Sequence, residues 1–356
     1  MEYREEIVKL KEQLGDDAVI LAHYYQKDEV CQYADIIGDS YALAVAASKS
    51  TAKYIVFCGV YFMAESAAIL ANPDQRVLIP DREAGCPLAD MANAADFEKY
   101  YAYCSSLAKS PLISIVYVNS SSSLKAAVGK LGGLTCTSSN AQFLVERVMA
   151  EGKRVFFLPD FNLGINTARR MELKNTVIGT IHRKADPENT SSDTKLFLWK
   201  GFCNVHARFS PMDIRKAKVN YPYAKILVHP ECDEAVVAES DFAGSTSQII
   251  KEVEQSPAGT TLFVGTELNL VNRLARETRH AAVFPLRESG CVNMNKITLE
   301  KLYQTLQSLL TGSSEYEVGI DETEKQDAKR ALAGMIGLVE QKKGEEHAST
   351  RKTERI

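Results

Sequence analysis

The chain has 356 residues, 45% of them hydrophobic and 25% charged, with a formal net charge of −4. It carries no large basic excess that would favour nucleic acid, and no apolar run is long enough to cross a membrane. The charged N-terminal segment 1–6 lacks the apolar core of a signal peptide, which predicts a cytoplasmic protein. In that reducing compartment the eight cysteines are expected to be ligands, nucleophiles or buried apolar residues rather than disulfides. A chain of this length is expected to form two or three domains.

The first third of the chain alternates between predicted strands and helices. Apolar residues at helical spacing predict an N-terminal helix at about 2–14. The segments that follow alternate in type: strands at 17–22, 55–58 and 76–80, and helices at 34–48 and 62–70. The first strand ends in the polar residues His23 and Tyr25. Ser40 lies near the start of the following helix, and the last strand leads into Gly85-Cys86.

The same order recurs in the second third of the chain. Its predicted elements are strands at 112–118, 154–158 and 196–199, and a helix at about 135–149. The first strand ends in Tyr117 and Asn119, and Ser138 lies at the start of the helix. The last strand leads into Cys203, and the polar stretch 184–193 is predicted to be an insertion or a flexible loop.

A third repeat follows. Its predicted elements are strands at 226–228, 261–264 and 282–284, and helices at 244–253 and 268–276. The first strand ends in His229 and Glu231, and the last leads into Cys291. Ser245 and Thr246 lie at the start of the first helix.

These repeats predict an α/β fold with a division into five segments. They are a first α/β/α module at 1–101, a second at 102–215 with the insertion near 184–193, a third at 216–296, C-terminal helices at 297–341 (about 297–311 and 321–341), and a charged, disordered tail at 342–356. Short strands alternating with helices predict parallel sheets, whose sites lie at the carboxyl ends of the strands. The polar residues at each strand end are spaced i, i+2, so they share one side of an extended chain. The sequence therefore predicts a site where the modules meet.

One cysteine occupies the same place in each of the three modules, one or two residues after a glycine. These cysteines are Cys86, Cys203 and Cys291. One cysteine alone is weak evidence for a ligand, because free cysteine is among the most buried residue types. Core packing is the better interpretation for three others: Cys31, Cys58 and Cys104. The roles of Cys136 and Cys232 stay open. The shared position favours a metal site with three protein ligands, and the absence of any Cys-x-x-Cys pair argues against a zinc ribbon or a ferredoxin-type cluster.

Several side chains near these positions could move protons. His23 and His229 both lie at strand ends, and histidine suits proton transfer near neutral pH. Three further groups could carry protons, although a lone tyrosine at a strand end usually packs: Tyr25, Tyr117 and Glu231. His206 follows Cys203 by three residues and is either an acid–base group or a hydrogen-bonded structural histidine.

Hydroxyl residues recur at the predicted helix starts: Ser40, Ser138, Ser245 and Thr246. Backbone N–H groups and the helix dipole favour anions there. Plain N-capping would explain one such helix. Three helices of this kind around one centre favour the binding of phosphate or carboxylate.

These motifs resemble those of the quinolinate synthase family, over nearly the whole chain from about Val19 to Met335. The resemblance rests on specific segments: Ala22-His23-Tyr24-Tyr25-Gln26, Ala34-Asp35-Ile36-Ile37-Gly38-Asp39-Ser40, Gly85-Cys86-Pro87-Leu88-Ala89-Asp90-Met91, Tyr117-Val118-Asn119-Ser120, Cys136-Thr137-Ser138-Ser139-Asn140-Ala141, Cys203-Asn204-Val205-His206, His229-Pro230-Glu231-Cys232, Gly244-Ser245-Thr246-Ser247-Gln248, Gly265-Thr266-Glu267 and Ser289-Gly290-Cys291-Val292-Asn293-Met294.

The resemblance implies three α/β/α domains with parallel sheets, related by a pseudo-threefold axis around one central [4Fe–4S] cluster per chain. Cys86, Cys203 and Cys291 would be its three ligands, leaving one iron open as a Lewis acid. The family condenses iminoaspartate with dihydroxyacetone phosphate, losing phosphate and water, to give quinolinate for NAD biosynthesis. An L-aspartate oxidase or dehydrogenase would supply the iminoaspartate.

Carried over residue by residue, the resemblance implies two overlapping sets of pocket residues. The catalytic set is His23, Tyr25, His206, His229 and Glu231. The substrate-binding set is His23, Ser40, Tyr117, Asn119, Ser138, His229, Glu231, Ser245 and Thr246. In one respect the chain departs from some members, which carry a Cys-x-x-Cys run around the third ligand that can form a redox-sensitive disulfide. The later position here is Met294, so that regulation is not expected.

Two other classes of protein remain open at this point. A redox or iron-sensing protein would also hold a cluster, but it would not need three helix starts and acid–histidine pairs facing it. A cluster-free sugar-phosphate-binding protein would explain the hydroxyls but not the repeated cysteines. Anaerobic visible absorption followed by a ligand titration separates the three classes.

Overall fold

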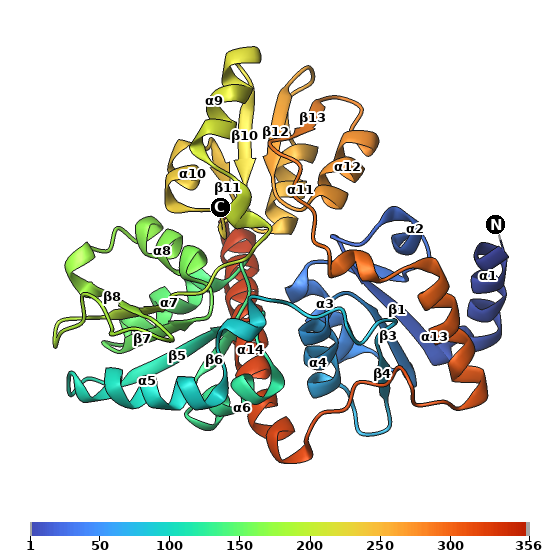
Figure 1. Ribbon diagram of the computed structural model, residues 1–356, viewed down its shortest axis with the longest axis horizontal. Coiled ribbons are helices and arrows are strands. Elements are labelled where there is room, and N and C mark those ends of the chain that lie inside the picture. The colour runs from blue at the N-terminus through green and yellow to red at the C-terminus, as the bar shows by residue number, and fades with distance from the viewer. Residues whose placement is uncertain (1, 354–356) are drawn as a thin grey trace.

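The computed structural model describes residues 2–353 and contains three separate parallel β-sheets arranged around a common centre (Figure 1). The strand orders are β2-β1-β3-β4, β6-β5-β7-β9-β8 and β11-β10-β12-β13. The same order, 2-1-3-4, therefore underlies each sheet, with one extra strand in the second. This arrangement confirms the α/β class with three parallel-sheet modules.

The first module is built around β1, whose buried residues pair on both sides. Its elements are α1 (Glu2–Leu14), β1 (Ala18–His23), α2 (Asp28–Cys31), β2 (Ile36–Gly38), α3 (Ser40–Lys49), β3 (Tyr54–Cys58), α4 (Tyr61–Leu70) and β4 (Arg76–Leu78). The helix predicted at 34–48 is wrong at its start, because residues 36–38 form the edge strand β2 beside β1. Such a strand is too short to show a periodic pattern, and it forms because β1 offers it a partner.

The second module has one strand more than the other two. Its elements are α5 (Ala94–Ser106), β5 (Leu112–Tyr117), α6 (Ser122–Lys130), β6 (Leu134–Cys136), α7 (Ala141–Ala150), β7 (Arg154–Leu158), α8 (Phe161–Arg170), β8 (Ile178–Ile181) and β9 (Leu196–Trp199). The stretch 184–193 lies between β8 and β9, outside the helices and strands. The strand β8, which the sequence analysis missed, pairs with β9 at the edge of the sheet.

The third module repeats the plan of the first. Its elements are α9 (Pro211–Asn220), β10 (Lys225–Val228), α10 (Glu234–Glu239), β11 (Phe242–Ala243), α11 (Thr246–Glu254), β12 (Thr261–Gly265), α12 (Leu268–Glu277) and β13 (Ala282–Pro285). Here too a two-residue edge strand, β11, precedes the helix with paired hydroxyls.

Two expected boundaries fall inside helices. The division at 101/102 cuts α5, whose Phe97 stacks on Phe156 of β7 at 5.9 Å between ring centroids, so the helix packs with the second sheet. The division at 215/216 cuts α9, where Ile214 packs with Ile226 in the core of the third module. Both helices precede the sheet that they cover, which sequence periodicity alone does not reveal.

The C-terminal helices α13 (Leu299–Thr311) and α14 (Glu322–Thr353) tie the modules together. The helix α13 packs on α1, where the rings of Tyr3 and Tyr303 lie 5.4 Å apart. The helix α14 packs against α6 and β6 of the second module and α4 of the first (Figure 1). Tyr41 of α3 also donates a hydrogen bond to Glu340 of α14 at 2.8 Å.

The disorder expected for 342–356 is wrong for most of that segment, because α14 continues to Thr353. The remaining residues, 354–356, lie outside the described residues. The charged tail is rich in strong helix formers, and pairs such as Lys342–Glu346 at i, i+4, with N and O 3.7 Å apart, favour a solvated helix. The density of charges in this segment therefore does not by itself predict disorder.

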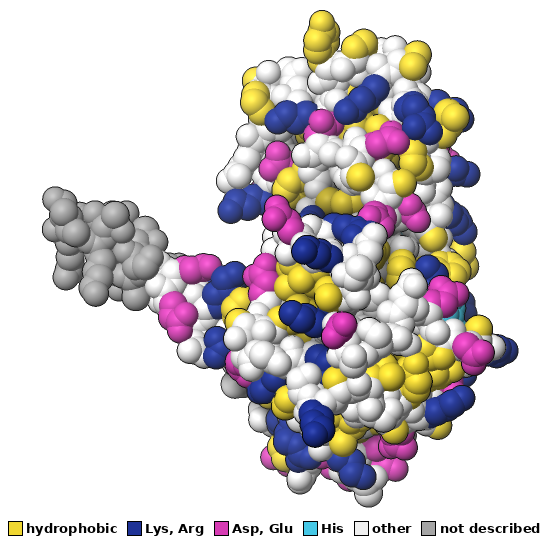
Figure 2. All heavy atoms as spheres, turned by 90° about the vertical axis from the view of Figure 1, so that its left-hand side faces the viewer, with side chains coloured by type: hydrophobic (Ala, Val, Ile, Leu, Met, Phe, Trp, Pro, Cys, Tyr) yellow, Lys and Arg dark blue, Asp and Glu magenta, His cyan; other side chains and the backbone are white. Residues whose placement is uncertain are grey.

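The surface carries charges of both signs. On the face seen in Figure 2, basic and acidic side chains are interspersed among polar and hydrophobic ones. None of the helices in residues 2–353 is long and apolar enough to span a membrane.

The close packing of α6 on α14 gives a stability test. A Cβ on Gly129 would collide with the backbone carbonyl of Asp327, whereas Gly337 on α14 faces open space. We expect Gly129→Ala to lower the free energy of unfolding by about 1–3 kcal/mol, since the backbone of α14 must move. Gly337→Ala, the control, should raise it by about 0.5–1 kcal/mol through helix propensity. Urea denaturation midpoints measure both changes, and equal effects of the two variants would contradict this packing.

Candidate active site

The carboxyl ends of strands from all three modules meet at one cavity. Nearly all predicted site residues line it: His23, Tyr25, Ser40, Cys86, Tyr117, Asn119, Ser138, Cys203, His206, His229, Glu231, Thr246 and Cys291. Ser245 is the exception, because its hydroxyl accepts the Gln248 N–H and caps α11. A cavity lined by apolar side chains and a few convergent polar groups suits a small-molecule ligand.

Each of the three repeated cysteines precedes a single 3₁₀ turn: Ala89–Met91, His206–Arg208 and Met294–Lys296. In each case the sulfur accepts hydrogen bonds from backbone N–H groups two and three residues further along, as from Leu88 and Ala89 to Cys86. Burial raises the pKa of all three thiols, to about 12 for Cys86. Donors aimed at sulfur stabilise a thiolate, and a bound cation would provide the remaining charge compensation.

The other cysteines are buried away from the cavity lining. They are Cys31, Cys58, Cys104, Cys136 and Cys232, and all are free thiols. The thiol of Cys232, which follows Glu231, points at the carbonyl of Gly265 at 3.8 Å. Cys136 ends β6 and is completely buried. Both are accounted for by packing.

Two of the strand-end residues repeat one local geometry. Nδ1 of His23 accepts the Tyr25 N–H at 3.2 Å, and Nδ1 of His229 accepts the Glu231 N–H at 3.3 Å. A ring nitrogen that accepts must be unprotonated, so in the neutral His23 ring the proton is on Nε2. Nδ1 of His229 also lies 3.3 Å from a carboxylate oxygen of Glu231, and when it carries the proton it can donate to that oxygen instead. Nε2 of His229 lies 3.2 Å from the Ser138 hydroxyl, across the boundary between the third and second modules.

Glu231 is the charged centre of the cavity and is 2% exposed. Its Oε2 lies 2.6 Å from Nδ1 of His206 and 3.3 Å from Nδ1 of His229, and the two rings stack 4.3 Å apart. Burial alone would raise the pKa of Glu231, but the two histidines lower it overall, so the carboxylate is ionised. Its Oε1 and the amide oxygen of Asn119 are buried without a hydrogen-bond partner among residues 2–353, which leaves both available to a ligand.

Thr266 is the buried link that the sequence analysis did not assign to the site. Its hydroxyl lies 2.9 Å from the Tyr25 hydroxyl and 3.1 Å from Nε2 of His206. Thr246 donates a further hydrogen bond to the Tyr25 hydroxyl at 3.1 Å. Burial raises the pKa of Tyr25 well above its usual range, so the phenol is neutral. The only sequence signal for Thr266 is its place directly after β12, in Gly265-Thr266-Glu267.

The helix starts divide into capping and free hydroxyls. Asp39, rather than Ser40, caps α3 by accepting the Ala42 N–H at 2.9 Å. With Ser245 used as a cap on α11, three predicted hydroxyls remain on the cavity: Ser40, Ser138 and Thr246. The N-capping interpretation is therefore correct for Ser245 and does not explain the other three.

One further set of side chains could hold a metal ion. Ligand atoms of Cys203, His206 and Glu231 all lie within 4.8 Å of one another. The cavity therefore offers metal ligands, a buried carboxylate with two histidines, and hydroxyls at helix starts in one enclosed space. Together with the three parallel sheets, these features define an enzyme whose active site lies between its modules.

Comparison with known proteins identifies the family. The chain belongs to the quinolinate synthetase A family, whose model matches residues 5–337. A quinolinate synthase from Streptomyces coelicolor is 42% identical over 339 residues, covering 92% of this chain and 86% of that protein. Others come from a Geobacillus species (41% identical, 92% and 91% covered) and Listeria monocytogenes (39% identical, 93% and 92% covered).

The buried His23 gives a pH-dependent prediction. Burial lowers its pKa from 6.5 to about 4. Between these values His23 binds a proton in the unfolded chain but not in the folded chain. Stability should therefore fall as the pH drops from 6.5 towards 4, by about 1.5 kcal/mol between pH 6.5 and 5 from this group. His23→Gln should flatten the dependence by that amount in urea titrations, and the exposed control His280→Gln should not. Equal slopes for His23→Gln and the unchanged chain would refute this assignment.

Proposed function

We propose that this chain condenses iminoaspartate with dihydroxyacetone phosphate, with loss of phosphate and water, to form quinolinate for NAD biosynthesis in the cytoplasm. Membership of the quinolinate synthetase A family supports the reaction. The observation that carries the proposal is the single cavity shared by three thiols and the buried chain Glu231–His206–Thr266–Tyr25. The unstable iminoaspartate would be supplied by an L-aspartate oxidase or dehydrogenase.

The donor set of the cavity fits one [4Fe–4S] cluster. Cys86, Cys203 and Cys291 would hold it, and the backbone N–H groups aimed at each sulfur are typical of cluster ligation. Three ligands leave one iron open, and the bound cluster would supply Lewis-acid chemistry. A single ion on Cys203, His206 and Glu231 would leave the other two thiols unexplained, so we favour the cluster.

The cavity hydroxyls and amide suit the anionic parts of both substrates. Ser40 and Thr246 lie at the first turns of α3 and α11, where N–H groups and the helix dipole attract phosphate or carboxylate. Ser138, Tyr117 and Asn119 add polar groups from the second module. Neutral His23 can donate from Nε2 without adding charge.

The buried hydrogen-bond chain provides a route for protons. Tyr25 presents a neutral phenol to the cavity and can give its proton to a departing oxygen. The Thr266 hydroxyl can then replace that proton and take another from Nε2 of His206. Oε2 of ionised Glu231 lies 2.6 Å from Nδ1 of His206, which orients the ring with Nε2 towards Thr266. Condensation and dehydration both require proton donors and acceptors of this kind.

Replacement of one repeated cysteine tests the ligand assignment. We expect Cys86→Ala to leave the chain folded but to reduce cluster iron and to abolish quinolinate formation, because one of the three thiols is lost. Cys58→Ala, at a buried position outside the cavity, should retain both iron and activity. Iron analysis of anaerobically purified protein and a product assay give the answer. Full iron and full activity in Cys86→Ala would refute the assignment.

Removal of the linking hydroxyl tests the proton route. Thr266→Val keeps the shape of the side chain and breaks the contact between Tyr25 and His206, so kcat should fall about 100-fold or more. Thr305→Val is the matched control, since that hydroxyl is equally buried and only bonds its own helix at Lys301. Unchanged kcat in Thr266→Val, with iron content retained, would exclude this route.

A further inference from the structure

The segment that carries His23 and Tyr25 belongs to the first module, but much of its support comes from the third. Tyr25 contacts Thr246 and Thr266 through its hydroxyl, and both threonines are in the third module. These contacts depend on where the backbone of Tyr25 lies relative to the third module. Helix α12 of the third module lies beside this segment.

Two side chains of α12 hold three consecutive backbone carbonyls of that segment. Nδ2 of Asn269 donates to the Tyr25 carbonyl at 2.9 Å. The guanidinium of Arg273 donates to the carbonyls of Tyr24 at 3.1 Å and Gln26 at 2.6 Å. Asn269 and Arg273 are spaced i, i+4, so they lie on the same face of the helix.

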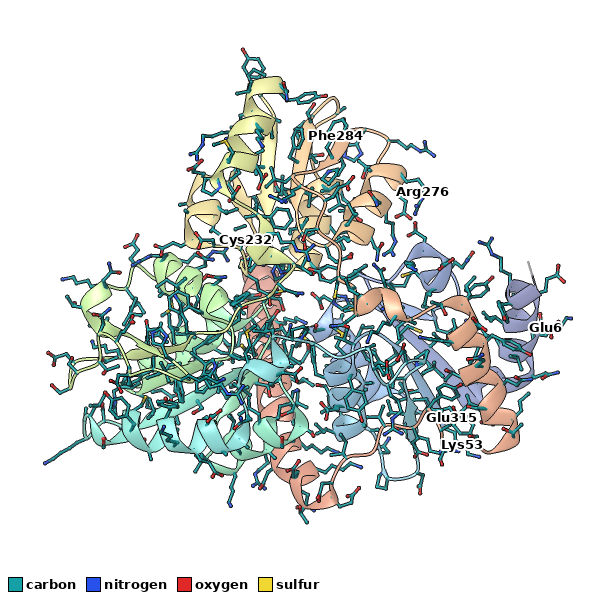
Figure 3. The ribbon with its side chains drawn as sticks, in the orientation of Figure 1. Glu6, Lys53, Cys232, Arg276, Phe284 and Glu315 are labelled. Atoms are coloured by element: carbon teal, nitrogen blue, oxygen red, sulfur yellow. The ribbon has the colours of Figure 1, made fainter. Side chains whose placement is uncertain are left out.

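Several hydrogen bonds hold the Arg273 guanidinium in place. Its side chain is 10% exposed, and its Nε donates to Asp28 at 2.7 Å, at the start of α2. Arg276, one turn further along α12, pairs with the same Asp28, but its side chain is 55% exposed. Figure 3 shows Arg276 at the outer edge of the third module. The guanidinium fork can serve several acceptors at fixed angles, which a lysine ammonium cannot reproduce.

The same helix face also reaches the third cysteine loop. Nδ2 of Asn269 donates to the side-chain oxygen of Asn295 at 2.9 Å, within the 3₁₀ turn that follows Cys291. Asn269 thus connects the backbone of Tyr25 to the loop of a proposed cluster ligand. These contacts join the Tyr25 segment to the loop that follows Cys291. A reaction that uses both would depend on their relative position.

We propose that Asn269 and Arg273 are positioning residues for Tyr25, which hold its backbone so that the phenol meets Thr246 and Thr266. This inference rests on the proposed function for its kinetic consequence, since Tyr25 is the proton donor there. A displaced phenol would leave the proton route incomplete even with the cavity otherwise intact. Displacements of about 1 Å in a site can reduce rates about 100-fold.

The kinetic test is a double-mutant cycle with Tyr25→Phe in the full chain, purified with its iron. Arg273→Met should lower kcat about 10- to 100-fold in the unchanged background and less than about 3-fold when Tyr25 is already Phe, because both changes remove the same contribution. Arg273→Lys should restore only part of the loss. Arg276→Gln, the control on the same helix and the same Asp28, should leave kcat unchanged. Equal losses in both backgrounds would overturn the proposal.

A second readout does not depend on activity. With 3-fluorotyrosine placed at position 25, the ¹⁹F resonance should shift in Arg273→Met and Asn269→Ala but not in Arg276→Gln. Asn269→Ala removes less of the buried network and serves if Arg273→Met does not fold. An unshifted resonance in a folded variant would overturn the proposal. If the unchanged chain forms no quinolinate, the proposed function fails while the ¹⁹F comparison still decides this inference.

Discussion

The convergence of three parallel sheets on one cavity is the constraint on which the site depends. Parallel strands end at one edge, so each module presents its strand-end residues and its cysteine loop on the same side. No single module contains the site: the contact chain runs from His206 in the second module through Thr266 in the third to Tyr25 in the first. The site therefore depends on the packing between modules, to which α14 and α12 contribute.

Burial gives similar side chains different charge states in this cavity. An ionised carboxylate buried at Glu231 would cost several kcal/mol alone, and His206 and His229 offset that cost by lying against it. His23 has no carboxylate this close, and burial keeps it neutral near pH 7. Tyr25 is likewise held as a neutral phenol. One cavity thus contains a fixed negative charge, a neutral donor and a chain of polar contacts that links the modules.

Residues that recur at the same place in each module could be predicted from the sequence. Residues whose role depends on contacts distant in the sequence could not. The buried strands, the strand-end pairs and the cysteine positions follow from local pattern, because each module must build the same edge. The short strand β2 exists only because β1 lies beside it, so its three residues carry no pattern of their own. Thr266 and Arg273 are important because of partners in other modules, 60 or more residues away in the sequence, and no local pattern marks either residue. The helix at 342–353 was missed because its charges were read without their i, i+4 spacing.

Iron and acid-labile sulfide analysis of the anaerobically purified full chain, followed by assay with iminoaspartate and dihydroxyacetone phosphate, tests the account most directly. Cys86, Cys203 and Cys291 on one cavity predict about four irons per chain and the formation of quinolinate. Iron without product would indicate a sensing or redox protein. A chain that takes up no iron after anaerobic reconstitution would contradict the central claim that the three modules together build a metal-dependent active site.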